Sequence, residues 1–150
     1  LLSLLKLSDR VMAGFLYSKL SPLPDYIKLD LEIREFFIFS SVSESILIEI
    51  MGILIDNAVQ ACTRERNQIR MILDSKEDRL LFEISNQAEP ESIGELSRFF
   101  EKGYSTKSSD GRRGLGLYRA RNLIKKVGGK LEVSVDTSQG TPELTFRVEL

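Results

Sequence analysis

The chain has 150 residues, of which 42% are hydrophobic, and its 21 lysines and arginines nearly balance 22 aspartates and glutamates. This size suits one domain with a two-layer core, and the balanced charge argues against nucleic-acid binding, which needs a strongly basic surface. The complete absence of histidine excludes Ser–His–Asp triads, histidine general bases and most zinc sites. No apolar run approaches the roughly 18 residues of a membrane-spanning helix, and the leucine-rich start lacks the features of a signal peptide, so we expect a soluble piece without membrane contact.

The first 20 residues predict an amphipathic helix, because their apolar side chains recur at spacings near three and four. Two prolines, Pro22 and Pro24, end it. A short leucine-rich helix cut off in this way is expected to pack on a partner helix more often than on its own domain. We therefore divide the chain into a helical segment (residues 1–20), a linker (21–25) and a main domain (26–150).

Strand and helix patterns alternate along the first half of the main domain. Residues 27–33 alternate apolar and polar side chains, as a half-buried strand does, and residues 36–39 predict a second short strand. Ser41 and Glu44 form a capping-box pattern ahead of a helix of about 18 residues that ends near Cys62. Beside Ala61 in this helix, Cys62 is expected to be a packed thiol in a reducing, cytosolic compartment.

The second half predicts a hairpin, two helices and two more strands. In chain order we expect strands at residues 68–73 and 79–85, a short helix at 91–100, a polar loop at 101–113, a long helix at 114–127 and strands at 130–135 and 143–150. The long helix is stopped by Gly128 and Gly129. The sum is an α+β sandwich, with a mixed sheet on one side and about three helices on the other.

Asp56 and Asn57 are the most unusual polar residues, since they follow an apolar run in the helix that should be most buried. Burying such groups without partners costs about 1–3 kcal/mol each. One interpretation is that the helix turns its polar face outward here. The other is that the Asn57 amide oxygen ligates a hard cation such as Mg²⁺.

A glycine motif and a basic loop suggest a phosphate site. Gly114 and Gly116 mark the predicted change from loop to helix, where free backbone N–H groups can bind an anion, although an ordinary junction would look the same. Dinucleotide and P-loop fingerprints are absent. The preceding loop offers cationic and hydroxyl donors to a polyphosphate, or is simply solvated; these donors are Ser105, Thr106, Lys107, Arg112 and Arg113.

The order of these motifs resembles the GHKL ATPase superfamily of gyrase, Hsp90, histidine kinases and MutL. The resemblance covers nearly the whole chain, and its most specific part runs from Phe99 to Tyr118. Within the superfamily the chain is most similar to histidine kinases that sense peptide pheromones in Gram-positive bacteria. The resemblance implies the two-layer Bergerat sandwich, with ATP and Mg²⁺ as cofactors.

The resemblance also implies roles for individual residues. Asn57 would hold the Mg²⁺ that bridges the phosphates, and Asn86 would receive the adenine amino group where the family usually has aspartate. Residues 101–113 would form the lid over ATP, with Lys107 joining Asn57 in catalysis. The remaining residues that the resemblance places at the nucleotide are Gln60, Ser105, Thr106, Arg113, Gly114, Leu115, Gly116 and Leu117.

A kinase of this class transfers the ATP γ-phosphate to a histidine on a dimerisation helix, from which it passes to a response regulator. Residues 9–19 resemble the second helix of that hairpin, and the histidine-bearing first helix is absent. The resemblance therefore implies a fragment that cannot phosphorylate itself, taken from the cytoplasmic part of a membrane-anchored bacterial receptor that works as a homodimer.

Three departures from the family pattern keep other functions open. Ile53 stands where superfamily ATPases carry a glutamate base and cannot activate water, and Glu49, about 12 Å from Asn57 along the helix axis, is a poor substitute. Gln60 replaces a lysine common in histidine kinases, and Asn86 is neutral. The alternatives are a degenerate nucleotide-sensing or scaffold module and a serine kinase of the anti-sigma type; the helix at residues 9–19 argues against the second.

Overall fold

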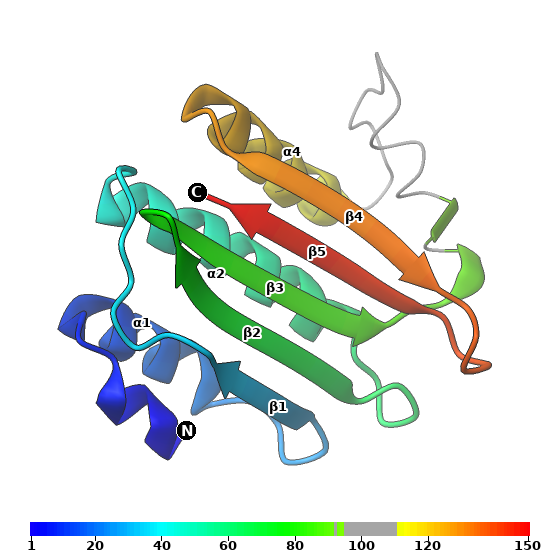
Figure 1. The fold of residues 1–150 in the computed structure, drawn as a ribbon. Coiled ribbons are helices and arrows are strands. Elements are labelled where there is room, and N and C mark those ends of the chain that lie inside the picture. Colours follow the sequence, from blue (N-terminus) through cyan, green and yellow to red (C-terminus); the bar gives the residue numbers. More distant parts are fainter. Residues whose placement is uncertain (92, 95–110) are drawn as a thin grey trace.

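The fold is a two-layer sandwich, which confirms the predicted α+β class. The computed structural model describes residues 1–91, 93–94 and 111–150, without the side chains of 111–114. The predicted loop at residues 101–110 and most of the helix at 91–100 therefore lie outside the described residues. One five-stranded sheet has the order β1-β2-β3-β5-β4, in which β1 runs parallel to β2 and the other pairs are antiparallel. Helices cover one face of this sheet (Figure 1).

The strands agree with the predicted pattern, with the hairpin strands longer than predicted. They are β1 (Lys28–Ile33), β2 (Gln68–Lys76), β3 (Arg79–Gln87), β4 (Lys130–Asp136) and β5 (Glu143–Glu149). Glu77 and Asp78, with φ angles of 52° and 61°, make the tight turn between β2 and β3. Because the turn is this short, β2 extends as far as Lys76. β3 is longer at its other end, where Asn86 pairs with Ile69 of β2 and Leu144 of β5 and so becomes part of the strand.

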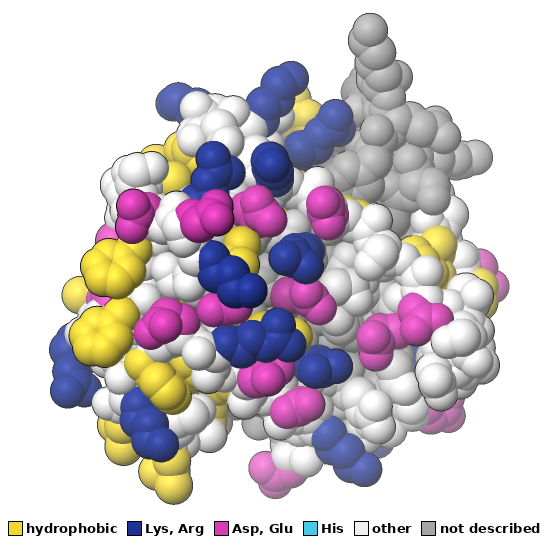
Figure 2. Space-filling model, viewed as in Figure 1, with side chains coloured by type: hydrophobic (Ala, Val, Ile, Leu, Met, Phe, Trp, Pro, Cys, Tyr) yellow, Lys and Arg dark blue, Asp and Glu magenta, His cyan; other side chains and the backbone are white. Residues whose placement is uncertain are grey.

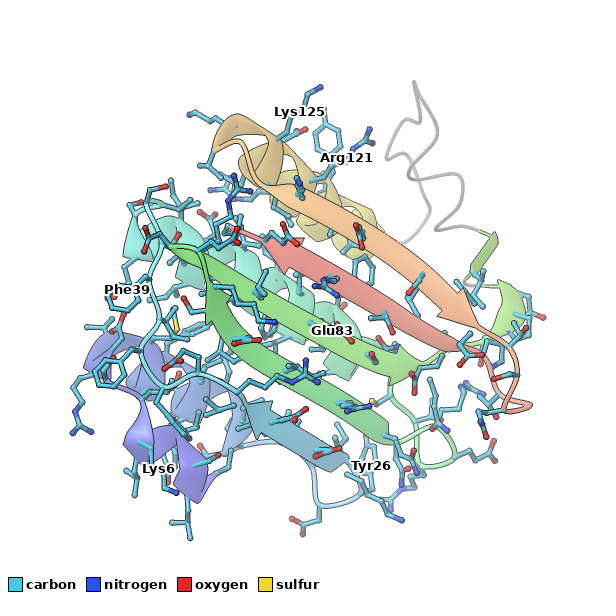
Figure 3. All side chains as sticks on the ribbon, viewed as in Figure 1. Lys6, Tyr26, Phe39, Glu83, Arg121 and Lys125 are labelled. Atoms are coloured by element: carbon cyan, nitrogen blue, oxygen red, sulfur yellow. The ribbon has the colours of Figure 1, made fainter. Side chains whose placement is uncertain are left out.

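The two faces of the sheet differ in character. Along β3, Leu80, Phe82 and Ile84 are buried on the face that the helices cover. The opposite face is open, and Figure 2 shows acidic and basic side chains interspersed over it; Glu83 is one of these outward residues (Figure 3). This mixture of charges is that of a solvated sheet face.

The central helix α2 (Glu44–Ala61) has the predicted length of 18 residues but a different cap. Its N-cap is Ser43, without a side-chain capping bond, so the predicted capping box from Ser41 is wrong. The Ser40 hydroxyl donates to the Leu150 carbonyl and accepts from the Val42 N–H. These bonds tie the segment before the helix to Leu150, just beyond β5, and α2 begins only after this segment, at Glu44. Cys62 at the far end is a buried thiol, and burial raises its pKa.

The predicted strand at residues 36–39 is wrong. The segment is held by separate bonds instead of a ladder: the Ser8 hydroxyl donates to the Phe36 carbonyl, and the Phe39 N–H donates to Ser75 Oγ. β1 pairs with β2 only as far as Leu73, and beyond that point the Phe39 backbone bonds to the Ser75 hydroxyl and forms no ladder with β2. Phe37 and Phe39 are 60% and 59% exposed.

The N-terminal segment is two helices, and it packs on its own domain. The 3₁₀ helix η1 (Leu2–Lys6) precedes α1 (Arg10–Leu20). The expectation that the segment packs on a partner is wrong for its apolar face, because five of its side chains join the domain core: Leu4, Leu7, Met12, Leu16 and Leu20. They cover apolar surface of α2 and the sheet that would otherwise face water. No described helix is long and apolar enough to cross a membrane.

Asp9 separates the two N-terminal helices and caps α1. Its carboxylate accepts hydrogen bonds from the backbone N–H groups of Val11 and Met12, at 3.0 and 3.1 Å. Burial opposes ionisation of Asp9, but its hydrogen bonds, with Glu44 as well as with the two N–H groups, outweigh burial and lower its pKa. The ionised cap therefore contributes stability above the ordinary pKa of aspartate, and this contribution is lost as pH falls through the lowered value.

We expect Asp9→Ala to lower the free energy of unfolding by about 1 kcal/mol at pH 7, and by less at pH 3, which is below the ordinary pKa of aspartate, so that part of the stabilisation by the ionised cap is lost. Urea unfolding at both pH values measures the difference. Asp9→Asn is the control, because the amide keeps an acceptor for the same N–H groups. An equal loss from Asp9→Ala at both pH values would contradict the capping role.

The second long helix, α4 (Gly111–Lys126), begins three residues before the predicted start at Gly114. Its end agrees with the prediction. Gly128 has a φ of 74°, its N–H donates to the Lys125 carbonyl, and the Gly129 N–H donates to the Ile124 carbonyl. This pair of hydrogen bonds is a Schellman motif, which turns the chain directly into β4.

Gly129 is required for close packing. A Cβ there would lie 2.7 Å from Leu150 Cδ2 and 2.8 Å from the Glu149 carbonyl oxygen. We expect Gly129→Ala to lower the free energy of unfolding by about 1–3 kcal/mol, as measured by urea unfolding. Gly14→Ala, where a Cβ meets nothing within 4 Å, is the matched control. An equal effect of the two substitutions would exclude the steric explanation.

Candidate nucleotide-binding site

One stripe of α2 carries three of the residues that the sequence singles out. Ile53, Asn57 and Gln60 follow at helical spacing and therefore share a face. Asn57 is partly buried, and no described residue makes a hydrogen bond to its side chain. Gln60 is exposed one turn further on. Asn57 thus presents an amide oxygen that the surrounding structure does not use.

Asp56 has a different explanation from its neighbour. Its carboxylate is exposed and pairs with the Lys19 ammonium of α1, with Nζ 2.8 Å from Oδ1 and 3.0 Å from Oδ2. The outward-facing interpretation is therefore right for Asp56, which pairs with Lys19 of α1, and the amide of Asn57, unpaired among the described residues, is what remains for a ligand.

Helix α4 packs against the same stripe and runs antiparallel to α2. A Cβ on Gly116 would lie 3.5 Å from Ile53 Cγ2, and three residues later Arg119 forms an ion pair with Glu49. From Gly116 to Arg119 the contacts move towards the C-terminus of α4, whereas from Ile53 to Glu49 they move towards the N-terminus of α2. The N-terminal turn of α4 therefore extends towards Asn57 and Gln60. The unpaired N–H groups and positive dipole end of that turn favour an anion at this place.

These contacts also give Ile53 and Glu49 structural roles. Ile53, at the position of the superfamily's base, packs against Gly116 of α4. Glu49 hydrogen-bonds Arg119 and thereby raises the pKa of that guanidinium. Glu49 is thus committed to holding α4 and is not placed to act as a base.

The glycine motif lies inside α4, and the expectation that Gly114 opens the helix is wrong. Leu117 is buried in the core, whereas Leu115 is exposed. The side chains of Arg113 and Gly114 lie outside the described part of the chain, as do Ser105, Thr106 and Lys107. Figure 3 shows Arg121 and Lys125, further along α4, projecting outward from the domain.

Asn86 lies near the end of β3, in line with Leu80, Phe82 and Ile84 on the helix-covered face. It is only 2% exposed. Its amide Nδ2 donates to the Gln87 carbonyl at 3.0 Å, and its Oδ1 is buried without any hydrogen-bond partner. Because the Gln87 carbonyl can only accept, it fixes the amide with Oδ1 as the free acceptor.

Two features near Asn86 could not be anticipated from the sequence. Arg66, in the connection between α2 and β2, forms an ion pair with Glu89 just beyond β3, and its Nε is a buried donor without a partner. The Oε1 of Gln87 is a buried acceptor without a partner. No periodicity or motif marks these residues; only the extension of β3 past Ser85 brings them to the same end of the sheet.

Comparison with known proteins shows the family to which the chain belongs. Residues 44–146 match the family model of the GHKL domain. The chain is 32% identical over 107 residues to the probable C4-dicarboxylate sensor kinase of Halalkalibacterium halodurans (69% of this chain, 19% of that protein). It is 30% identical over 132 residues to the sensor histidine kinase DcuS of Escherichia coli K12 (85% and 24%), and 30% identical over 131 residues to the sensor protein CitS of Bacillus subtilis (86% and 21%).

Solved structures share the fold. The nucleotide-free catalytic domain of the histidine kinase ThkA superposes with a TM-score of 0.67 at 19% identity, covering 94% of this chain and 88% of that one. The mycobacterial sensor histidine kinase MprB gives 0.65 at 19% identity, covering 93% and 94%. The chain therefore belongs to the GHKL domain family, in the form found in the ATP-binding catalytic domains of sensor histidine kinases. It spans about a fifth of the length of the curated relatives.

Proposed function

We propose that this chain binds ATP with Mg²⁺ and transfers the γ-phosphate to a histidine on a dimerisation helix outside it. The observation that carries the proposal is the buried, unpartnered Oδ1 of Asn86. Leaving such an acceptor unpaired costs about 1–3 kcal/mol, and the 6-amino group of adenine is a donor that would recover this cost. The fixed amide supports Asn86 as a neutral substitute for the family's aspartate.

The residues present also suit a magnesium–phosphate complex. Among the described residues there is no cluster of three or more His, Cys, Asp or Glu side chains, so a dedicated protein cage for a metal is not formed there. Mg²⁺ commonly takes one or two protein ligands and completes its shell with waters and substrate phosphates. Asn57 supplies one amide oxygen, and the N-terminal turn of α4 supplies backbone donors for the phosphates.

In this proposal each part of the chain has a separate task. When bound, Mg²⁺ would neutralise charge on the phosphates. Asn57 would hold the metal, and Asn86 would orient the base. Lys107, Ser105 and Thr106 would contact the phosphate tail from the predicted lid ahead of α4, and Arg113, Gly114 to Leu117 and Gln60 would border it. Phosphoryl transfer then depends on positioning and charge neutralisation.

Ile53 favours transfer to an imidazole over hydrolysis. An isoleucine side chain cannot remove a proton from water, and Glu49 is paired with Arg119. A neutral imidazole has its own lone pair and needs less help from a base. Ile53 is also the best support for the second candidate, a nucleotide-sensing or scaffold module without phosphotransfer.

The whole-protein context is also part of the proposal. We assign residues 1–20 to the end of the dimerisation hairpin, residues 21–25 to a linker and residues 26–150 to the catalytic domain. The full protein would then be a homodimeric, membrane-anchored bacterial receptor with a response regulator as its partner. The peptide-pheromone type stays a prediction; the relatives named above include a C4-dicarboxylate sensor kinase.

Phosphotransfer in trans separates the two candidates. The chain is mixed with a helical hairpin that carries the acceptor histidine of a related kinase and with γ-phosphate-labelled ATP. We expect acid-labile label on the hairpin, lost when its histidine is replaced by glutamine. Nucleotide binding without any label on the hairpin would favour the sensing module.

A further inference from the structure

Helix α1 contacts α2 at the same two turns that carry Asn57. Gly52 and Asp56 are four residues apart on α2 and face α1, while Ile53 and Asn57, the residue after each, face α4 and the candidate site. In Figure 1, α2 lies between α1 and α4 behind the sheet. One short segment of α2 therefore has α1 on one side and the candidate phosphate site on the other.

The contact depends on a glycine. A Cβ on Gly52 would lie 3.3 Å from Cζ of the Phe15 ring and 3.7 Å from Cε of Lys19. The Lys19 chain then continues to Asp56, where the ammonium contacts both carboxylate oxygens. We call this contact, formed by Phe15 and Lys19 on Gly52 and Asp56, the α1 seat.

The α1 seat is not what holds α1 on the domain. Met12, Leu16 and Leu20 of α1 are almost completely buried and supply that anchoring. The Lys19–Asp56 pair is partly exposed, with side-chain exposures of 32% and 54%, and pairs of this kind add little to stability. The α1 seat therefore adds to this anchoring a contact that is specific in shape and charge, at the two turns of α2 that carry Asn57.

We propose that the α1 seat positions Asn57 and thereby sets the affinity of the site for Mg²⁺-bound nucleotide. This rests on the proposed function. Phe15, Gly52, Lys19 and Asp56 are then positioning residues that act through Asn57 without touching the ligand. Since binding coupling is reciprocal, Mg²⁺-ATP would in turn slow hydrogen exchange of the α1 backbone amides.

Gly52→Ala tests the positioning role with little expected change in stability. The added methyl group presses on Phe15, whereas alanine's higher helix propensity offsets the strain. We expect calorimetry to show Mg²⁺-ATP affinity lowered about 3- to 10-fold, with ATP affinity in EDTA within about twofold of wild type. A purely structural role would lower both affinities together. Adding Phe15→Leu makes room for the methyl group and should restore Mg²⁺-ATP binding.

Two further variants complete the test. Gly14→Ala introduces the same change in α1 where a Cβ meets nothing within 4 Å, and should leave both affinities at wild-type values. Lys19→Met keeps the aliphatic stem but removes the ion pair. It should lower only the affinity for Mg²⁺-ATP, as Gly52→Ala does. If Gly52→Ala does not fold, Lys19→Met alone tests the inference.

The outcomes distinguish this inference from the function on which it rests. If the unchanged chain does not bind Mg²⁺-ATP, the proposed function fails, and the inference fails with it. If the unchanged chain binds Mg²⁺-ATP, but the folded Gly52→Ala and Lys19→Met variants bind it equally well, only the inference is overturned.

Discussion

Asn57→Ala is expected to lower the affinity for Mg²⁺-ATP by at least about tenfold, because it removes the one protein ligand that we assign to the metal. The Asn57 side chain makes no hydrogen bond to any described residue, so its truncation should cost the fold little. Calorimetric titration with ATP, in Mg²⁺ and in EDTA, measures the effect. In EDTA the variant and the wild type should bind ATP with nearly equal affinity.

Asp56→Ala is the neighbouring control for this prediction. It removes a carboxylate that pairs with Lys19, and we expect a smaller loss than from Asn57→Ala, because Asp56 acts only through the α1 seat. Loss of ATP binding in EDTA on Asn57→Ala would show that Asn57 supports the fold or the base instead of the metal.

Asn86→Leu is expected to weaken ATP binding about 5- to 100-fold while changing the stability of the fold by no more than about 1 kcal/mol. Leucine has nearly the same shape, but it offers no acceptor to the adenine amino group, which then stays unpaired at a cost of about 1–3 kcal/mol. Without nucleotide, the substitution removes a buried acceptor that has no partner but also the hydrogen bond to the Gln87 carbonyl, and the two effects on the free energy of unfolding oppose each other. Calorimetry measures the binding, and urea unfolding measures the stability.

Asn86→Asp is the matched control for adenine recognition. A carboxylate keeps acceptor oxygens at the same place, so this variant should bind ATP at least as well as Asn86→Leu and should discriminate against GTP, whose base presents a 6-oxo acceptor. Wild-type affinity for ATP in Asn86→Leu would contradict the assignment of the adenine amino group to Asn86.

The sequence predicts the elements of this fold well where periodicity is strong. The apolar run of α2 and the alternating residues of β5 give their element types directly, and Gly128 with its positive φ marks the end of α4. Errors arise where tertiary contacts decide. Phe36 and Phe39 look like strand residues, but their backbone groups bond to Ser8 and Ser75.

The candidate site shows the same division. Asn57 is noticed because it follows an apolar run, and Asn86 only through the resemblance to the GHKL superfamily; each has an amide oxygen without a hydrogen-bond partner among the described residues. The packing of Gly116 on Ile53, the pairing of Glu49 with Arg119 and the α1 seat could not be predicted, because each joins residues far apart in sequence. Such contacts depend on how helices cross, which no local pattern encodes.

Calorimetric titration of the unchanged chain with ATP tests the central claim most directly. The account predicts saturable, one-to-one binding of ATP that is stronger in Mg²⁺ than in EDTA and much weaker for GTP. Absence of ATP binding in Mg²⁺, or equal binding of ATP and GTP, would contradict it.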